Sequence, residues 1–141
     1  MRRLDDVIAW LKRAKSNLFI AREAKIDENV FYEDLCFEAQ QCVEKSFKAL
    51  CIFNNILYPK THNIGHLIDL LETNGIKIPK ALRVSAELTD YSVEARYPGD
   101  YEEVSKREYL KAVKTADRVL KWVAKKTDRK STRLNSSHRI R

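Results

Sequence analysis

The chain has 141 residues, of which 44% are hydrophobic and 33% are charged, and its formal net charge is +7. One domain is expected at this length. The apolar runs are too short and too often interrupted by charge to cross a bilayer, and no apolar signal-peptide core follows Met1, so we expect a cytoplasmic protein without a membrane segment.

The first half of the chain predicts two long amphipathic helices joined by a short connection. The first covers residues 4–25, and the second covers residues 30–54. In both, apolar residues recur at spacings of three and four, which is typical of a helix with one buried face. The first face holds Val7, Ile8, Leu11, Ala14, Leu18 and Ala21, with Trp10 at its edge; the second holds Leu35, Ala39, Val43, Phe47, Leu50 and Cys51.

The second half predicts a short helix over residues 64–72, with Thr61 or Asn63 as its cap and Asn74-Gly75 as its end. A further helix begins near Pro79 and runs to residue 95, where a Pro-Gly turn stops it. The last helix spans residues 102–126. The expected buried residues are Ile64, Leu67, Ile68 and Leu71, then Leu82, Ala86 and Tyr91, then Tyr109, Leu110, Val113, Ala116, Val119, Leu120 and Val123.

These elements predict an all-α fold, an antiparallel up-and-down bundle of four to five helices. No segment alternates with period two for long enough to predict a sheet. Cys36, Cys42 and Cys51 all fall on the helix over residues 30–54, and their odd count without a CxxC pair favours neither a disulfide framework nor a zinc site.

The last fourteen residues, 128–141, differ sharply in composition from the rest. The run DRKSTRLNSSH resembles a translated sequencing adapter, so we interpret residues 1–127 as the domain and residues 128–141 as a non-native, disordered tail. On this interpretation the natural chain ends near Thr127 or continues into other sequence. The tail places five basic residues against Asp128, and removing its net charge of +4 leaves a mildly basic domain of +3.

The first candidate site is ARYPGDY, residues 95–101. Arg96 could bind phosphate in a bidentate manner, with Tyr97 or Tyr101 as a hydroxyl donor. The alternative interpretation is a structural turn whose aromatic rings pack on the bundle and whose arginine pairs with Asp100 or Glu102.

Two other groups of polar residues are candidate sites. His62 and His66 are four residues apart, but no further ligands complete a metal set, and a helix start with a capping histidine is preferred. Lys45 and Lys48 lie on the polar side of the helix over residues 30–54, where Glu44 and Lys48 are expected to form a solvated pair. No phosphate loop or cofactor motif is present, so we expect neither a cofactor nor a metal.

The whole pattern resembles the HEPN domain, the higher eukaryote and prokaryote nucleotide-binding family. The resemblance rests on the order and spacing of several segments over residues 4–125. These are Trp10 and Ala14, AQQCVEKSFKAL at 39–50, KTHNIGHLIDLL at 60–71, and YSVEARYPGDY at 91–101.

The resemblance implies a homodimeric helical bundle, often encoded beside a minimal nucleotidyltransferase as a toxin–antitoxin pair. Active members are metal-independent ribonucleases with an Arg-x4–6-His motif, in which histidine handles the ribose 2′-hydroxyl proton and arginine steadies phosphate. Here Arg96 fits the arginine, but Tyr101, Glu102 and Glu103 occupy the histidine positions. Tyrosine, with an ordinary pKa of about 10, is a poor general base at neutral pH.

Two functions therefore stay open, beside a third possibility, a helical scaffold with no ligand. The preferred one is a dimeric module that binds nucleotide or RNA phosphate through Arg96 and partners a nucleotidyltransferase, which could modify Tyr97 or Tyr101. The alternative is a divergent ribonuclease toxin that uses Arg96 with Tyr101, or with His62 brought near by folding.

Overall fold

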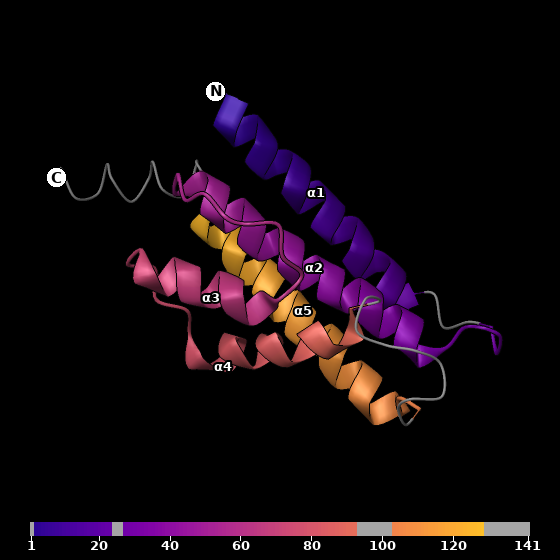
Figure 1. Ribbon diagram of the computed structural model, residues 1–141. Helices are drawn as coiled ribbons and strands as arrows, with labels where there is room; N and C mark the ends of the chain where they lie inside the picture. Colours follow the sequence, from indigo (N-terminus) through magenta and orange to yellow (C-terminus); the bar gives the residue numbers. More distant parts are fainter. Residues whose placement is uncertain (1, 24–26, 93–102, 129–141) are drawn as a thin grey trace, which may run out of the picture.

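The computed structural model describes residues 2–23, 27–92 and 103–128. Every regular element in these ranges is a helix, and they contain no strand (Figure 1). The all-α bundle expected from the sequence is thus confirmed. The elements are α1 (Arg2–Glu23), α2 (Tyr32–Phe53), α3 (Ile64–Thr73), α4 (Lys80–Arg83), the 3-10 helix η1 (Val84–Tyr91) and α5 (Lys106–Lys126).

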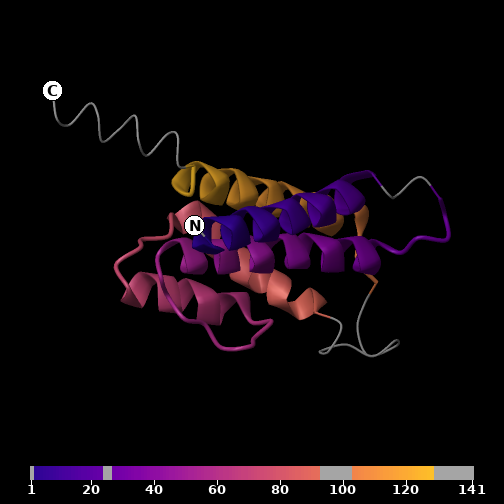
Figure 2. The ribbon, with the colours of Figure 1, turned by 90° about the horizontal axis from the view of Figure 1, so that it is seen from above.

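Helix α2 is the central element. Helix α1 runs antiparallel along one side of it, α5 lies along another, and α3 and η1 cover the remaining face (Figures 1 and 2). The long segments α1, α2, α4–η1 and α5 alternate in direction. None of the helices in the described ranges is both long and apolar enough to cross a membrane.

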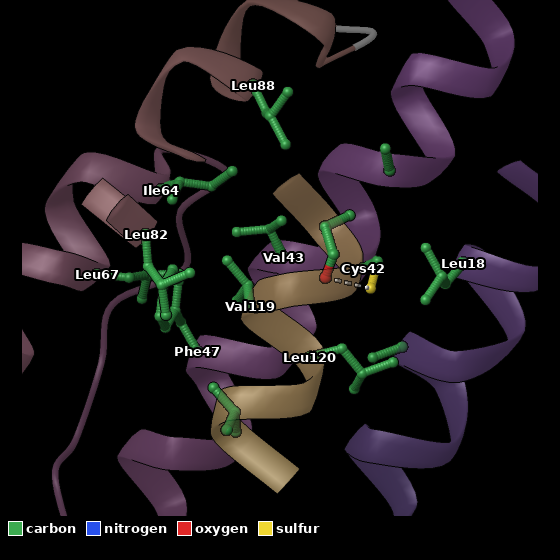
Figure 3. Close-up of a cluster of buried hydrophobic side chains, with 14 of the residues drawn as sticks. Leu18, Cys42, Val43, Phe47, Ile64, Leu67, Leu82, Leu88, Val119 and Leu120 are labelled. Carbon is green, nitrogen blue, oxygen red and sulfur yellow. Dashed lines mark hydrogen bonds between the residues drawn. The ribbon is translucent and has the colours of Figure 1, made fainter. Parts of the chain in front are cut away.

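The core forms where α2 meets its neighbours. All six residues of its predicted stripe are buried, and Figure 3 shows Val43 and Phe47 among side chains of α3, α4 and α5. The three cysteines are buried, and Cys42 lies with its sulfur 3.9 Å from the carbonyl oxygen of Ala116 on α5. A side chain as large as Phe47 has no exposed surface because four elements surround α2.

Helix α3 begins and ends where the sequence predicts. The side chain of Asn63 accepts a hydrogen bond from the backbone N–H of His66 at 3.2 Å, so Asn63 is the N-cap and the expected capping histidine was wrong. Gly75 follows the helix with φ of 87°, the left-handed conformation that favours glycine there. The four predicted apolar residues of α3 are buried.

The segment after Pro79 differs from the single α-helix that was predicted. Four residues form α4, and the chain then tightens into the 3-10 helix η1. Leu82, Ser85 and Leu88 are buried at intervals of three residues. Three residues make one turn of a 3-10 helix, so the geometry of η1 directs both Ser85 and Leu88 against the core, whereas a continued α-helix would rotate them progressively away from the side of Leu82.

Two residues predicted to be buried are exposed. Ile8 on α1 is 53% exposed and Leu110 on α5 is 52% exposed. Each lies six residues before a fully buried alanine, Ala14 or Ala116, and therefore about 120° around its helix from the centre of the contact. The buried strips of α1 and α5 are narrower than the sequence pattern suggested.

Helix α5 starts at Lys106, four residues later than predicted. The Ser105 side chain accepts a hydrogen bond from the Glu108 N–H at 3.1 Å. Ser-x-x-Glu is a capping signal that could have been read from the sequence. The N–H of Val104, just before the cap, donates to Oε1 of Glu33 at 2.7 Å and fixes the start of α5 beside the start of α2.

Candidate functional site

The primary candidate, ARYPGDY, lies outside the described residues, so Arg96, Tyr97, Asp100 and Tyr101 are not placed. The residues that flank this segment are placed. Tyr91, near its beginning, donates a hydrogen bond from its hydroxyl to Glu108 of α5, and Val104, after its end, is held by Glu33 of α2. The flanks therefore lie where α2 and α5 begin.

The described residues contain a polar cluster in which Gln40, Glu44 and Lys48, buried on α2, meet His62 from the loop before α3. The Lys48 ammonium is 2.7 Å from Oε2 of Glu44. Oε1 of Glu44 accepts a hydrogen bond from Nε2 of Gln40 at 2.9 Å and lies 3.0 Å from Nδ1 of His62. Nε2 of Gln40 is also 3.2 Å from the carbonyl oxygen of His62, so two contacts join α2 to the loop before α3.

The expectation that Glu44 and Lys48 form a solvated pair was wrong. Glu44 is only 3% exposed and Lys48 8% exposed. Trp10 of α1 and Tyr58 of the loop after α2 flank the Lys48 ammonium, with ring centres 5.8 and 5.7 Å away. Both rings are within the range of cation–π attraction. Residues outside α2, one from α1 and one from the loop after α2, thus cover its polar side.

Hydrogen bonds decide the charge of Glu44. Burial alone would raise the pKa of its carboxyl group, because a buried carboxylate loses its hydration. Hydrogen bonds involving Lys48, Gln40 and His62 outweigh that effect and hold the pKa below the ordinary value of 4.5. At neutral pH the cluster therefore holds a carboxylate beside the Lys48 ammonium.

Lys45 has a different environment from Lys48. It is half-buried, and its ammonium donates to Oδ1 of Asn17 on α1 at 2.8 Å. The amide of Asn17 in turn donates to Oε1 of Glu38 at 2.8 Å. Partial burial lowers the pKa of Lys45 from 10.5, while the nearby Glu38 carboxylate acts in the opposite direction. Lys45 has no carboxylate bonded directly to it in this network.

The two lysines lie away from the flanks of the ARYPGDY segment. Sixteen residues separate Lys48 from Tyr32, a distance of about 24 Å along the helix axis. Tyr32 stacks on Tyr109 of α5, with ring centres 5.0 Å apart, near the flanks. The described residues therefore bring Lys48 together with Glu44 and His62 in the C-terminal half of α2, whereas Tyr32 and Glu33, beside the flanks, lie at its N-terminal end.

His62 contacts Glu44 of α2, a pairing that the sequence did not indicate. Its side chain is 48% exposed and its ring contacts the buried Glu44 carboxylate. The spacing to His66 drew attention to a metal pair, whereas the actual partner is eighteen residues earlier on α2. Among the residues that the structure describes, no three His, Cys, Asp or Glu side chains gather to hold a metal ion.

Sequence comparison identifies similar proteins over most of the chain. A profile of the HEPN domain matches residues 7–127. A protein of Methanocaldococcus jannaschii named "Putative toxin MJ1304" is 26% identical over 128 residues, which cover 81% of this chain and 83% of that protein.

Two solved structures have a similar fold. The crystal structure of ST0689, an archaeal HEPN homologue, has a TM-score of 0.68 and 30% identity, and the match covers 86% of this chain and 98% of the other. The crystal structure of TT1696 from Thermus thermophilus has a TM-score of 0.70 and 27% identity, and the match covers 89% and 99% of the two chains. The similarity thus extends over nearly the whole length of both structures.

We predict that Lys48→Met lowers the free energy of unfolding by about 3–5 kcal/mol, because it leaves the Glu44 carboxylate buried without its cation. The double variant Glu44→Gln/Lys48→Met should recover most of this loss, since glutamine is neutral and still offers an oxygen to Gln40. Urea unfolding followed by circular dichroism measures both. The control is Lys12→Met on an exposed position of α1, and an equal effect of the two single variants would contradict the prediction.

Acid should remove the contribution of Glu44 to stability. Its pKa is lowered in the folded protein, so the contribution is fully present above the ordinary pKa of 4.5 and is lost as the pH falls through the lower, folded-state value. Glu44→Gln cannot titrate. The difference in unfolding free energy, wild type minus Glu44→Gln, should therefore decrease between about pH 5 and about pH 3. A difference that stays constant over this range would show that the Glu44 pKa is not lowered.

Proposed function

This chain belongs to the HEPN domain family, and from that membership we propose that it is a dimeric module that binds nucleotide or RNA phosphate. We further propose that it works with a minimal nucleotidyltransferase in a toxin–antitoxin-type system. The observation that carries the proposal is the HEPN match over residues 7–127, a range that contains Arg96, the residue we propose as the family's arginine.

The toxin–antitoxin part of the proposal draws on the similarity to the Methanocaldococcus protein. That protein carries the name "Putative toxin MJ1304", and the match covers about four-fifths of each chain, so it is not limited to one shared helix. We propose a second copy and a nucleotidyltransferase because HEPN domains are usually dimeric and are often encoded beside a minimal nucleotidyltransferase.

In this proposal Arg96 is the principal phosphate ligand. Its planar guanidinium can donate two parallel hydrogen bonds to phosphate oxygens. Tyr97 and Tyr101 supply hydroxyl donors, and Asp100 orients the guanidinium. Alternatively, the oxygen of one tyrosine bonds to the α-phosphorus of a nucleoside triphosphate held by the partner, pyrophosphate leaves, and the hydroxyl proton passes to solvent. Lys45 can add positive charge for a bound phosphate, because its ammonium donates to the neutral amide oxygen of Asn17 and not to a carboxylate. Lys48 supports the fold and does not contact the phosphate directly, since a phosphate would have to displace Glu44 from it.

Calorimetry with ATP and with a short RNA tests the binding function. We expect heat with at least one ligand, and Arg96→Ala should weaken that binding about tenfold or more, through loss of charge-assisted hydrogen bonds to phosphate. Arg13→Ala, at an exposed position of α1, is the matched control and should bind as the wild type does. Absence of heat with both ligands would refute the binding function.

One contact supports the alternative of a ribonuclease. A carboxylate beside an imidazole nitrogen can orient the ring as a general base, and Glu44 lies 3.0 Å from Nδ1 of the half-exposed His62. If the protein binds RNA without cleaving it, the wild-type protein leaves labelled RNA intact. Cleavage that disappears in both Arg96→Ala and His62→Ala, but not in His66→Ala, would instead establish the ribonuclease.

A further inference from the structure

Helix α5 bears a straight row of basic residues on its outer side. The intervals along the row are four, three, four, three and four residues, which keeps every member within about 40° of a single line along the helix. All six members are exposed. This α5 basic ridge consists of Arg107, Lys111, Lys114, Arg118, Lys121 and Lys125.

The ridge lies opposite the buried side of α5. The helix packs on the bundle through a separate set of residues, whose centre is about 170° around the axis from the ridge. Figure 2 shows α5 along one edge of the bundle, so its outer side is not covered by another described helix. The buried set is Tyr109, Ala112, Ala116, Val119, Leu120 and Val123.

The charge of the ridge is largely uncompensated. Asp117 lies to one side and pairs with Lys121 at 3.0 Å and with Arg22 of α1 at 2.7 Å. Glu108 lies to the other side and accepts a hydrogen bond from Tyr91. Within the described part of the chain, Lys121 is the one member of the ridge that has an ion-pair partner.

Such a row is unfavourable for the helix itself. Like charges three or four residues apart destabilise a helix by about 0.2–0.5 kcal/mol a pair, and the ridge has five adjacent pairs. A row serving only solubility or helix stability would alternate lysine with glutamate. The arrangement is therefore explained better by an external polyanion than by the fold.

We propose that the α5 basic ridge binds RNA along its phosphate backbone, without reading the base sequence. Adjacent charges are separated by rises of about 4.5 or 6 Å, and the row is about 27 Å long, so it suits an extended chain of regularly spaced anions. The choice of RNA rests on the proposed function, while none of the six ridge residues belongs to the Arg96 segment. A membrane is a poorer match, because the apolar side of α5 is already buried in the bundle.

The test uses the full chain and a fluorescently labelled single-stranded RNA of about 20 nucleotides, with binding followed by anisotropy at about 50–200 mM salt. The ridge variant is Lys111→Gln/Lys114→Gln/Arg118→Gln. We expect it to bind about ten- to a hundredfold more weakly at about 100 mM salt, with a salt dependence shallower by about 2 in log–log slope, because three phosphate contacts are lost.

The matched control, Lys12→Gln/Lys60→Gln/Lys77→Gln, removes the same charge from exposed positions elsewhere and should bind nearly as the wild type does. Equal weakening of both triple variants would overturn the proposal, since net charge alone would then explain binding. Wild-type affinity in the ridge variant would also overturn it and would assign any binding to other cations, including those of residues 129–141. Binding to phosphatidylserine vesicles but not to RNA would overturn it in favour of a membrane surface.

The ATP and RNA experiments distinguish a failure of the ridge proposal from a failure of the proposed function. ATP is too short to span the ridge, so the calorimetric heat with ATP and its loss in Arg96→Ala do not depend on α5. Normal ATP binding with an inactive ridge refutes this proposal alone. Ridge-dependent RNA binding without any ATP heat supports this proposal and limits the function to RNA.

Discussion

Enclosure of α2 on all sides is the constraint on which the rest of this structure depends. Because α1, α3, α5 and η1 all contact it, α2 has no fully solvated face in its C-terminal half. Its polar residues must therefore be satisfied within the protein. Unpaired burial of a carboxylate or an ammonium group would cost several kcal/mol, so Glu44 and Lys48 are compatible with this position only as partners. In the described residues no buried side-chain nitrogen or oxygen lacks a hydrogen-bond partner.

This requirement links the core to the loop before α3. Glu44 and Gln40 both contact His62, and the next residue but one, Ile64, donates its N–H to Oγ1 of Thr89 on η1 at 3.0 Å. A continuous set of polar contacts thus connects α2, the start of α3 and η1. Apolar packing alone is non-directional, whereas these hydrogen bonds require particular distances and angles. They fix where the loop crosses α2 and hence how α3 is placed.

Periodicity predicted the helices of this fold because each helix buries a definite stripe. The stripe of α2 and the four apolar residues of α3 follow directly from three- and four-residue spacing. The 3-10 geometry of η1 was missed because Ser85, a polar residue, holds the middle position of a three-residue repeat. The burial of Lys48 could not be predicted, since an i,i+4 pair looks the same in solvent as in a core, and its cover comes from Trp10 and Tyr58.

The candidate site could be predicted only from residue types placed at the spacing of the family motif. The structure changes which lysine and arginine residues a phosphate can bind most readily. A phosphate that binds Lys48 must first separate it from Glu44, leaving a carboxylate unpaired where only 3% of the residue is exposed. Binding at Lys114 or Arg118 requires no such exchange, because only solvent and mobile ions are displaced. Cations of the core therefore serve the fold, and a phosphate polymer meets the protein first on the outer side of α5.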